Sequence, residues 1–91
     1  MARRKGYSVE VYSSTKTPTQ PFGHSVEIRD IPTLDEAMNA AAIAMRNMTV
    51  EGTLKRGDEV MIYEEPSHDQ IYGAIVRDGE WRSYETRRRT R

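Results

Sequence analysis

The residue types best suited to catalysis lie together in one short segment. Ser67-His68-Asp69 contains the serine, the imidazole and the carboxylate of a hydrolase triad. A working triad draws these groups from separate parts of a fold, because consecutive residues in a turn rarely point at one another in the required geometry. The chain also lacks the Gly-x-Ser-x-Gly sequence that places a nucleophilic serine on a sharp turn. We therefore interpret these three residues as parts of a turn.

A metal site is the second chemistry that this region could support. His24 and His68, with the carboxylates of Glu64, Glu65 and Asp69, provide potential ligands. However, the chain has no Cys and no His-x-x-x-His spacing, the features that often mark a zinc site. Glu64 and Glu65 are also unsuited to act as an acid–base pair, because adjacent residues of a strand face opposite sides of a sheet. We predict a non-enzymatic protein with no catalytic residues, no metal site and no cofactor.

The segments that precede these residues have the hydrophobic pattern of short strands. Residues 7–12 alternate strictly, with Val9 and Val11 on one face, and residues 25–31 alternate in the same way. This period of two indicates half-buried strands. Residues 13–24 between them include two Pro and a Gly, so we expect a hairpin with a long tip.

A helix is predicted over residues 34–50. Thr33 and Glu36 form a capping box, in which the Thr33 side chain accepts a hydrogen bond from the backbone N–H of Glu36. Apolar residues then recur at helical spacing through a segment rich in Ala and Met. Gly52 is the expected C-terminal stop.

Three further strands follow the helix. After a turn at residues 55–58, residues 59–64 form one strand, and residues 71–77 and 80–84 form a hairpin around Asp78-Gly79. This dipeptide favours a type I′ turn. The predicted order is ββαβββ, an α+β domain in which one Ala/Met-rich helix packs on a largely antiparallel sheet. A β-grasp-like arrangement is one topology with this order of elements.

The two-residue loop also determines which residues face one another across this hairpin. It places Trp81 opposite Val76, and Tyr84 opposite Gly73, so that a tyrosine ring lies over a glycine. If Trp81 packs under the helix as part of the core, then Tyr84 and Ile71 lie on the opposite face of the sheet.

The composition indicates one small domain with a thin hydrophobic core. The 91 residues include only fifteen Leu, Ile, Val and Phe, so Met, Tyr, Trp and Ala must supply much of the core. The absence of Cys excludes disulfides. No apolar stretch approaches the roughly 20 residues of a membrane span, and the basic N-terminus is not followed by the apolar run of a signal peptide. We expect a cytoplasmic protein without membrane contact.

The charges are segregated along the chain, although 14 Lys and Arg balance 14 Asp and Glu overall. Half of the basic residues lie in two terminal tails, residues 1–6 and 87–91. Residues 7–86, the predicted domain, keep seven Lys and Arg with all fourteen carboxylates, a formal charge of −7. Such asymmetry indicates binding partners. The basic residues of the tails are Arg3, Arg4, Lys5, Arg87, Arg88, Arg89 and Arg91.

Two binding functions agree with this charge distribution. The first is a protein-binding module, a regulator or inhibitor such as a phage-like accessory protein, which docks through its acidic body, its aromatic hairpin face or its long loop. Its candidate contact residues are Tyr72, Trp81, Tyr84, Phe22, Glu64, Glu65 and Asp69. The alternative is a nucleic-acid-binding accessory protein whose basic tails contact the phosphates of DNA or RNA. A third interpretation is a homodimer that pairs through an edge strand.

Overall fold

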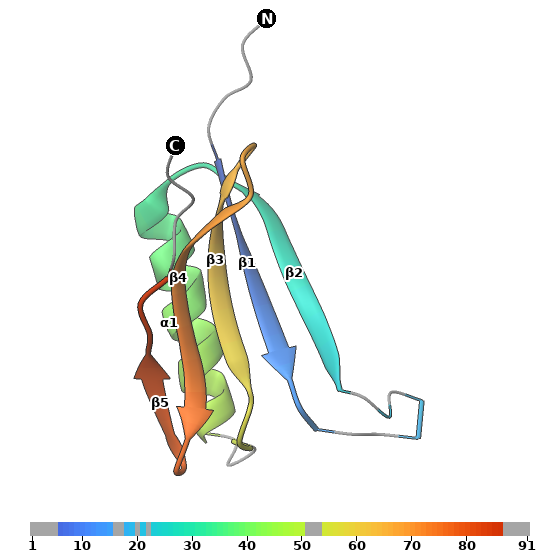
Figure 1. Ribbon diagram of the computed structural model, residues 1–91. Coiled ribbons are helices and arrows are strands. Elements are labelled where there is room, and N and C mark those ends of the chain that lie inside the picture. Colours follow the sequence, from blue (N-terminus) through green and yellow to red (C-terminus); the bar gives the residue numbers. More distant parts are fainter. Residues whose placement is uncertain (1–5, 16–17, 20, 22, 51–53, 87–91) are drawn as a thin grey trace, which may run out of the picture.

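The computed structural model describes residues 6–15, 18–19, 21, 23–50 and 54–86. The elements in chain order are β1 (Gly6–Ser13), β2 (His24–Ile31), α1 (Leu34–Val50), β3 (Glu59–Glu65), β4 (Asp69–Arg77) and β5 (Glu80–Ser83) (Figure 1). The predicted order ββαβββ and the α+β class are therefore confirmed. Each predicted element is present, and the ends that differ are shifted by only one or two residues.

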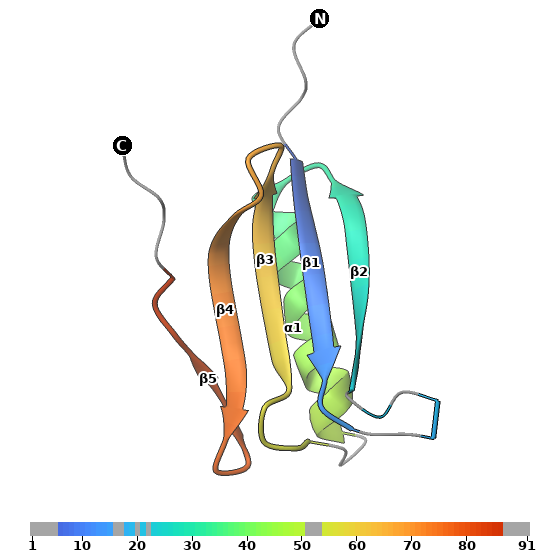
Figure 2. The same ribbon diagram turned by 45° about the vertical axis from the view of Figure 1, so that its right-hand side comes forward.

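The five strands form one sheet in the order β2-β1-β3-β4-β5, and each neighbouring pair is antiparallel. Strand β1 lies between β2 and β3 and pairs with both. Helix α1 connects β2 to β3 and therefore passes over β1. Figure 2 shows α1 against one face of the sheet, behind β1 and β3. This antiparallel sheet differs from the β-grasp-like alternative, in which two neighbouring strands run parallel.

Helix α1 has the predicted bounds, and it begins at Leu34 because its N-terminal cap forms. The backbone N–H of Glu36 donates to Oγ1 of Thr33 at 3.2 Å, and the N–H of Ala37 donates to the Thr33 carbonyl at 3.1 Å. The predicted stop, Gly52, lies outside the described residues. Within the described ranges, no helix combines the length and the apolar character that crossing a membrane requires.

The hydrophobic core lies between α1 and the central strands. Val9 of β1 and Val60 and Ile62 of β3 pack against Ala37 and Ala41 of α1. All five side chains are at most 1% exposed. The small alanines allow α1 to approach the sheet closely, but each buries little apolar area.

The β4–β5 hairpin has the predicted turn. Asp78 and Gly79 have φ values of 54° and 77°, and a type I′ turn requires positive φ at both positions. After β5, the backbone N–H of Tyr84 donates to the Gly73 carbonyl at 3.1 Å. The Tyr84 ring lies so close over Gly73 that a Cβ atom at residue 73 would be 2.2 Å from it. Only glycine fits beneath the ring in this position.

Trp81 and Ile71 both lie on the face of the sheet that α1 covers. Trp81 packs against the core, and its Nε1–H donates to Oγ1 of Thr49 at 3.1 Å. Ile71 packs against the core as well, so the prediction that Ile71 would face the other side is wrong. The reason is a β-bulge: the β3–β4 register shifts between Ile62 and Tyr63, and strict alternation fails at Ile71.

Candidate functional site

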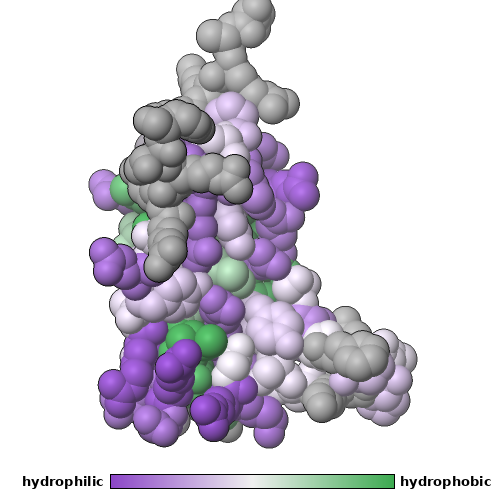
Figure 3. Space-filling view, viewed as in Figure 1, coloured by the Kyte–Doolittle hydropathy of each residue, from purple (hydrophilic) through white to green (hydrophobic). Residues whose placement is uncertain are grey.

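The face of the sheet opposite α1, called here the open face, is not covered by another helix or strand of the described chain (Figures 1 and 2). Side chains that alternate with the core residues point toward it. Figure 3 views the molecule from this side, where hydrophilic surface predominates. The open face carries carboxylates on β1, β2 and β3 (Glu10, Glu27, Glu59 and Glu65) and one on β5 (Glu80), three tyrosines (Tyr12, Tyr63 and Tyr84), and three arginines (Arg29, Arg77 and Arg82).

Two of these carboxylates are direct neighbours across strands. Glu10 of β1 lies opposite Glu27 of β2 in the antiparallel register. Burial raises the pKa of the nearby Tyr63 phenol, and the negative charges of Glu10 and Glu59 raise it further. Like charges at opposite positions destabilise a sheet. The stability of the fold therefore does not explain why Glu10 and Glu27 face each other.

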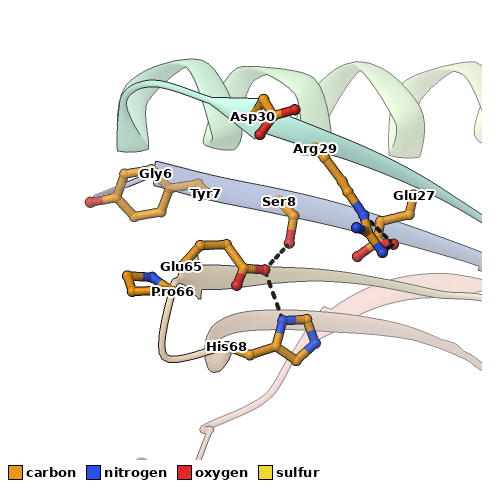
Figure 4. Close-up of a pocket in the computed structure, with 9 residues that line it drawn as sticks. All are labelled: Gly6, Tyr7, Ser8, Glu27, Arg29, Asp30, Glu65, Pro66 and His68. Atoms are coloured by element: carbon orange, nitrogen blue, oxygen red, sulfur yellow. Dashed lines mark hydrogen bonds and ion pairs between the residues drawn. The ribbon is translucent and has the colours of Figure 1, made fainter. Parts of the chain in front are cut away.

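A pocket of about 500 Å³ lies at the end of the open face where β1 begins (Figure 4). It is formed by the start of β1, the end of β2 and the β3–β4 turn. The polar side chains that line it are Ser8, Glu27, Arg29, Asp30, Glu65 and His68. With three carboxylates and one guanidinium, the lining carries a net negative charge.

Glu65 is held in this pocket by two hydrogen bonds. Its Oε2 accepts one from Nδ1 of His68 at 2.8 Å and one from the Ser8 hydroxyl at 3.0 Å. The hydrogen bond from His68 lowers the pKa of Glu65 below its usual range. Burial opposes this effect, and the hydrogen bond from Ser8 lowers the pKa by a smaller amount. The His68 ring stacks on Tyr63, with ring centroids 4.3 Å apart. Glu65 is therefore ionised and oriented at neutral pH.

Arg29 and Glu27 form the opposite side of the pocket. Nε and Nη2 of Arg29 both lie 2.9 Å from Oε1 of Glu27. The Arg29 side chain is 74% exposed, so this ion pair adds little to stability. Beside it, Asp30 has a φ of 62° at the bulge where the β1–β2 register shifts. The pair shows that this side of the pocket accommodates a guanidinium next to a carboxylate.

The serines of this region do not form a relay with His68. Ser8 and His68 bind the same carboxylate oxygen, so the imidazole is not placed to take the Ser8 proton. The Ser67 hydroxyl donates to a backbone carbonyl of the turn at 3.2 Å and accepts the N–H of Asp69 at 3.3 Å. Among the residues that the structure describes, no group of three or more His, Asp or Glu could hold a metal ion.

The predicted contact residues are divided between the two faces. Tyr72 and Trp81 lie on the covered face, where both pack against the core. Tyr84 and Glu65 lie on the open face. The Tyr84 hydroxyl donates to Glu59, and burial, followed by this hydrogen bond, raises the pKa of Tyr84 to about 12. The covered and open faces thus present different subsets of the predicted residues.

The remaining predicted residues lie elsewhere. Glu64 and Asp69 are paired at the end of the β3–β4 hairpin, next to the turn. Phe22 and the seven basic residues of the tails lie outside the described residues. The sequence analysis did not identify Glu10 and Glu27, although alternation assigns each of them to the polar side of its own strand. The missing information was which strands are neighbours.

The chain matches no protein-family model, no curated protein and no solved structure.

Proposed function

We propose that this protein is a non-enzymatic interaction module that binds a basic segment of a partner protein through the open face. The observation that carries the proposal is the gathering of four carboxylates on the β1, β2 and β3 part of the open face, with Glu10 and Glu27 directly opposite each other. Two carboxylates directly opposite each other lower the stability of the sheet. Binding a partner of opposite charge would offset their repulsion. The formal charge of −7 over residues 7–86 supports the same choice of partner.

The tyrosines of the open face supply contact area beside these charges. Tyr63 is fixed by its stack with His68, and Tyr84 accepts a hydrogen bond from Nε2 of Gln70 at 2.8 Å. Side chains that are already fixed lose little conformational entropy on binding, and Tyr is enriched among residues that dominate binding energy. The pocket beside Glu65 offers room for one basic side chain of the partner.

A module of this kind would act as an accessory or regulatory protein in the cytoplasm of its cell or host. If the open face occupied a basic cleft of its partner, the protein would be an inhibitor. The small size and the segregated charges suit a phage-like accessory protein.

The test is the affinity of the full chain for a fluorescein-labelled peptide that alternates Arg and Gly, measured by fluorescence anisotropy. The double variant Glu27→Gln with Glu65→Gln should bind this peptide about tenfold more weakly, because each lost exposed ion pair is worth up to about 1 kcal/mol. Added salt should weaken binding by the wild-type chain, since exposed charges are screened.

The matched control is Asp35→Asn with Glu36→Gln, which removes the same number of charges from the first turn of α1. This variant should retain most of the affinity, because α1 lies on the other side of the sheet. An equal loss in both double variants would mean that the peptide responds only to net charge. Such a result, or no binding by the wild-type chain at low salt, would refute the open face as the site.

Nucleic-acid binding through the tails is the second candidate. The observation that favours it is that seven of the fourteen Lys and Arg lie in residues 1–6 and 87–91. The open face opposes contact with nucleic acid, because its carboxylates would repel phosphates. In this alternative the tails would provide the binding energy.

Labelled DNA and RNA, titrated with the full chain over a range of salt, test this alternative. Binding through the tails predicts that log K falls with log salt with a slope of about −3 to −6. Replacing the seven basic residues of the tails with Gln should abolish binding. No binding at low salt would rule the alternative out.

A further inference from the structure

The sheet has two outer strands in the described chain, and they differ in length and in protection. β5 has 4 residues, and its Trp81 packs against the core. β2 has 8 residues, pairs with β1 on one side only, and leaves Ser25 through Asp30 exposed. A long exposed edge presents unpaired N–H and C=O groups that can pair with another strand.

The outer strand β2 also exposes apolar side chains. Val26 and Ile28 lie opposite Val11 and Val9 of β1, and therefore on the face of the sheet that carries α1. Because α1 lies mainly over β1 and β3, Val26 remains 58% exposed and Ile28 43% exposed.

We infer that the protein forms a symmetric dimer in which β2 pairs antiparallel with β2 of a second copy. The strand is complementary to itself in this orientation. When Ile28 lies opposite Ile28 of the second copy, Glu27 lies opposite Arg29 of the second copy, and the two-fold symmetry repeats this pair. Glu27 and Arg29 are already within 2.9 Å of each other in one chain, so both side chains lie on the same face.

A second copy accounts for the other features of this edge. It provides backbone partners for the unpaired side of β2, and it covers the flank of Ile28, while Val26 lies opposite Asp30 of the second copy. Pairing edge to edge joins the two sheets into one and places both open faces on the same side. The inference does not depend on the proposed function, because the dimer is measured without any other partner.

The test is the mass of the full chain in solution, measured by light scattering after size exclusion and by sedimentation up to millimolar concentration. The dimer has twice the protomer mass of 10.5 kDa. Glu27→Arg or Arg29→Glu alone should raise the dimer Kd about tenfold or more, because two attractive pairs become repulsive. Mixing the two variants should restore dimers, since each reversed residue then faces the opposite charge.

Arg82→Glu is the control, because it reverses a charge on β5, at the other edge of the sheet. It should leave the dimer unchanged. A wild-type chain that stays monomeric at millimolar concentration would overturn the inference. So would a dimer that neither charge reversal weakens, or a mixture of the two variants that remains monomeric. Circular dichroism of each variant distinguishes loss of the dimer from loss of the fold.

Discussion

A single buried carboxylate, that of Asp58, joins the loop after β1 to the loop before β3. Its Oδ1 accepts the backbone N–H and the hydroxyl of Ser14, both at 2.8 Å, and its Oδ2 accepts the N–H of Lys55 at 3.0 Å. The side chain is fully buried. The sequence predicts only a turn here, because nothing in residues 55–58 reveals a bond to a residue more than forty positions earlier.

Asp58→Ala should lower the free energy of unfolding by about 2–4 kcal/mol, because three partly buried donors lose a charged acceptor. Asp58→Asn should cost less, since its amide oxygen still accepts one or two of these bonds. Urea denaturation of both variants measures the difference. An alanine variant as stable as the wild-type chain would show that these bonds contribute nothing.

Glu65 should make stability depend on pH at the acidic end. Because the pKa of Glu65 is lower in the folded chain than in the unfolded one, its contribution is fully present above the unfolded pKa. The contribution is lost as the pH falls through the folded pKa. The stability difference between the wild-type chain and Glu65→Gln should be constant near neutral pH and should shrink below about pH 4. Urea denaturation at neutral and acidic pH measures it, and an unchanged difference would contradict the assignment.

At the scale of elements, the features that depend on neighbouring residues could be predicted from the sequence. The helix over residues 34–50 follows from the Thr33 cap and its apolar period, and the β4–β5 register follows from Asp78-Gly79. The position of Ile71 could not be predicted, because a bulge interrupts the alternation. The open face could not be assembled either, since the sequence does not show that β1 lies between β2 and β3.

Trp81→Ala should separate β5 from α1. It should lower the free energy of unfolding by about 2–4 kcal/mol, somewhat less than for a fully buried tryptophan. Thr49→Val keeps the shape of the partner and removes the hydrogen bond from Nε1 together with the one that the Thr49 hydroxyl donates to the Met45 carbonyl, so it should cost about 1 kcal/mol. Urea denaturation compares the two. Retained stability with loss of binding in Trp81→Ala would instead make Trp81 a contact residue for a partner.

At the scale of the whole molecule, the two faces of the sheet carry different kinds of side chain: apolar ones on the covered face, and mainly charged residues and tyrosines on the open face. The covered face holds the core, whereas the open face places Glu10 directly opposite Glu27. Glu10→Gln should therefore raise the free energy of unfolding by a few tenths to about 1 kcal/mol, because it removes the repulsion from Glu27. The same variant should bind the Arg-Gly peptide more weakly. Thermal unfolding and anisotropy measure the two effects, and a loss of stability would contradict the proposed repulsion.

The pairing of β1 with β3 has a consequence for the chain as it is made. The ribosome releases β1 first, but β3 follows only after the β1–β2 hairpin and the whole of α1. Until β3 emerges, Val9 has its partner from β2 but lacks the central strand that completes the core. Contacts between residues so distant in sequence form late and slow the folding of a domain. Pairing β1 with β3 therefore closes the longest stretch of chain between neighbouring strands of this sheet, and the entropy lost in closing it adds to the barrier to folding.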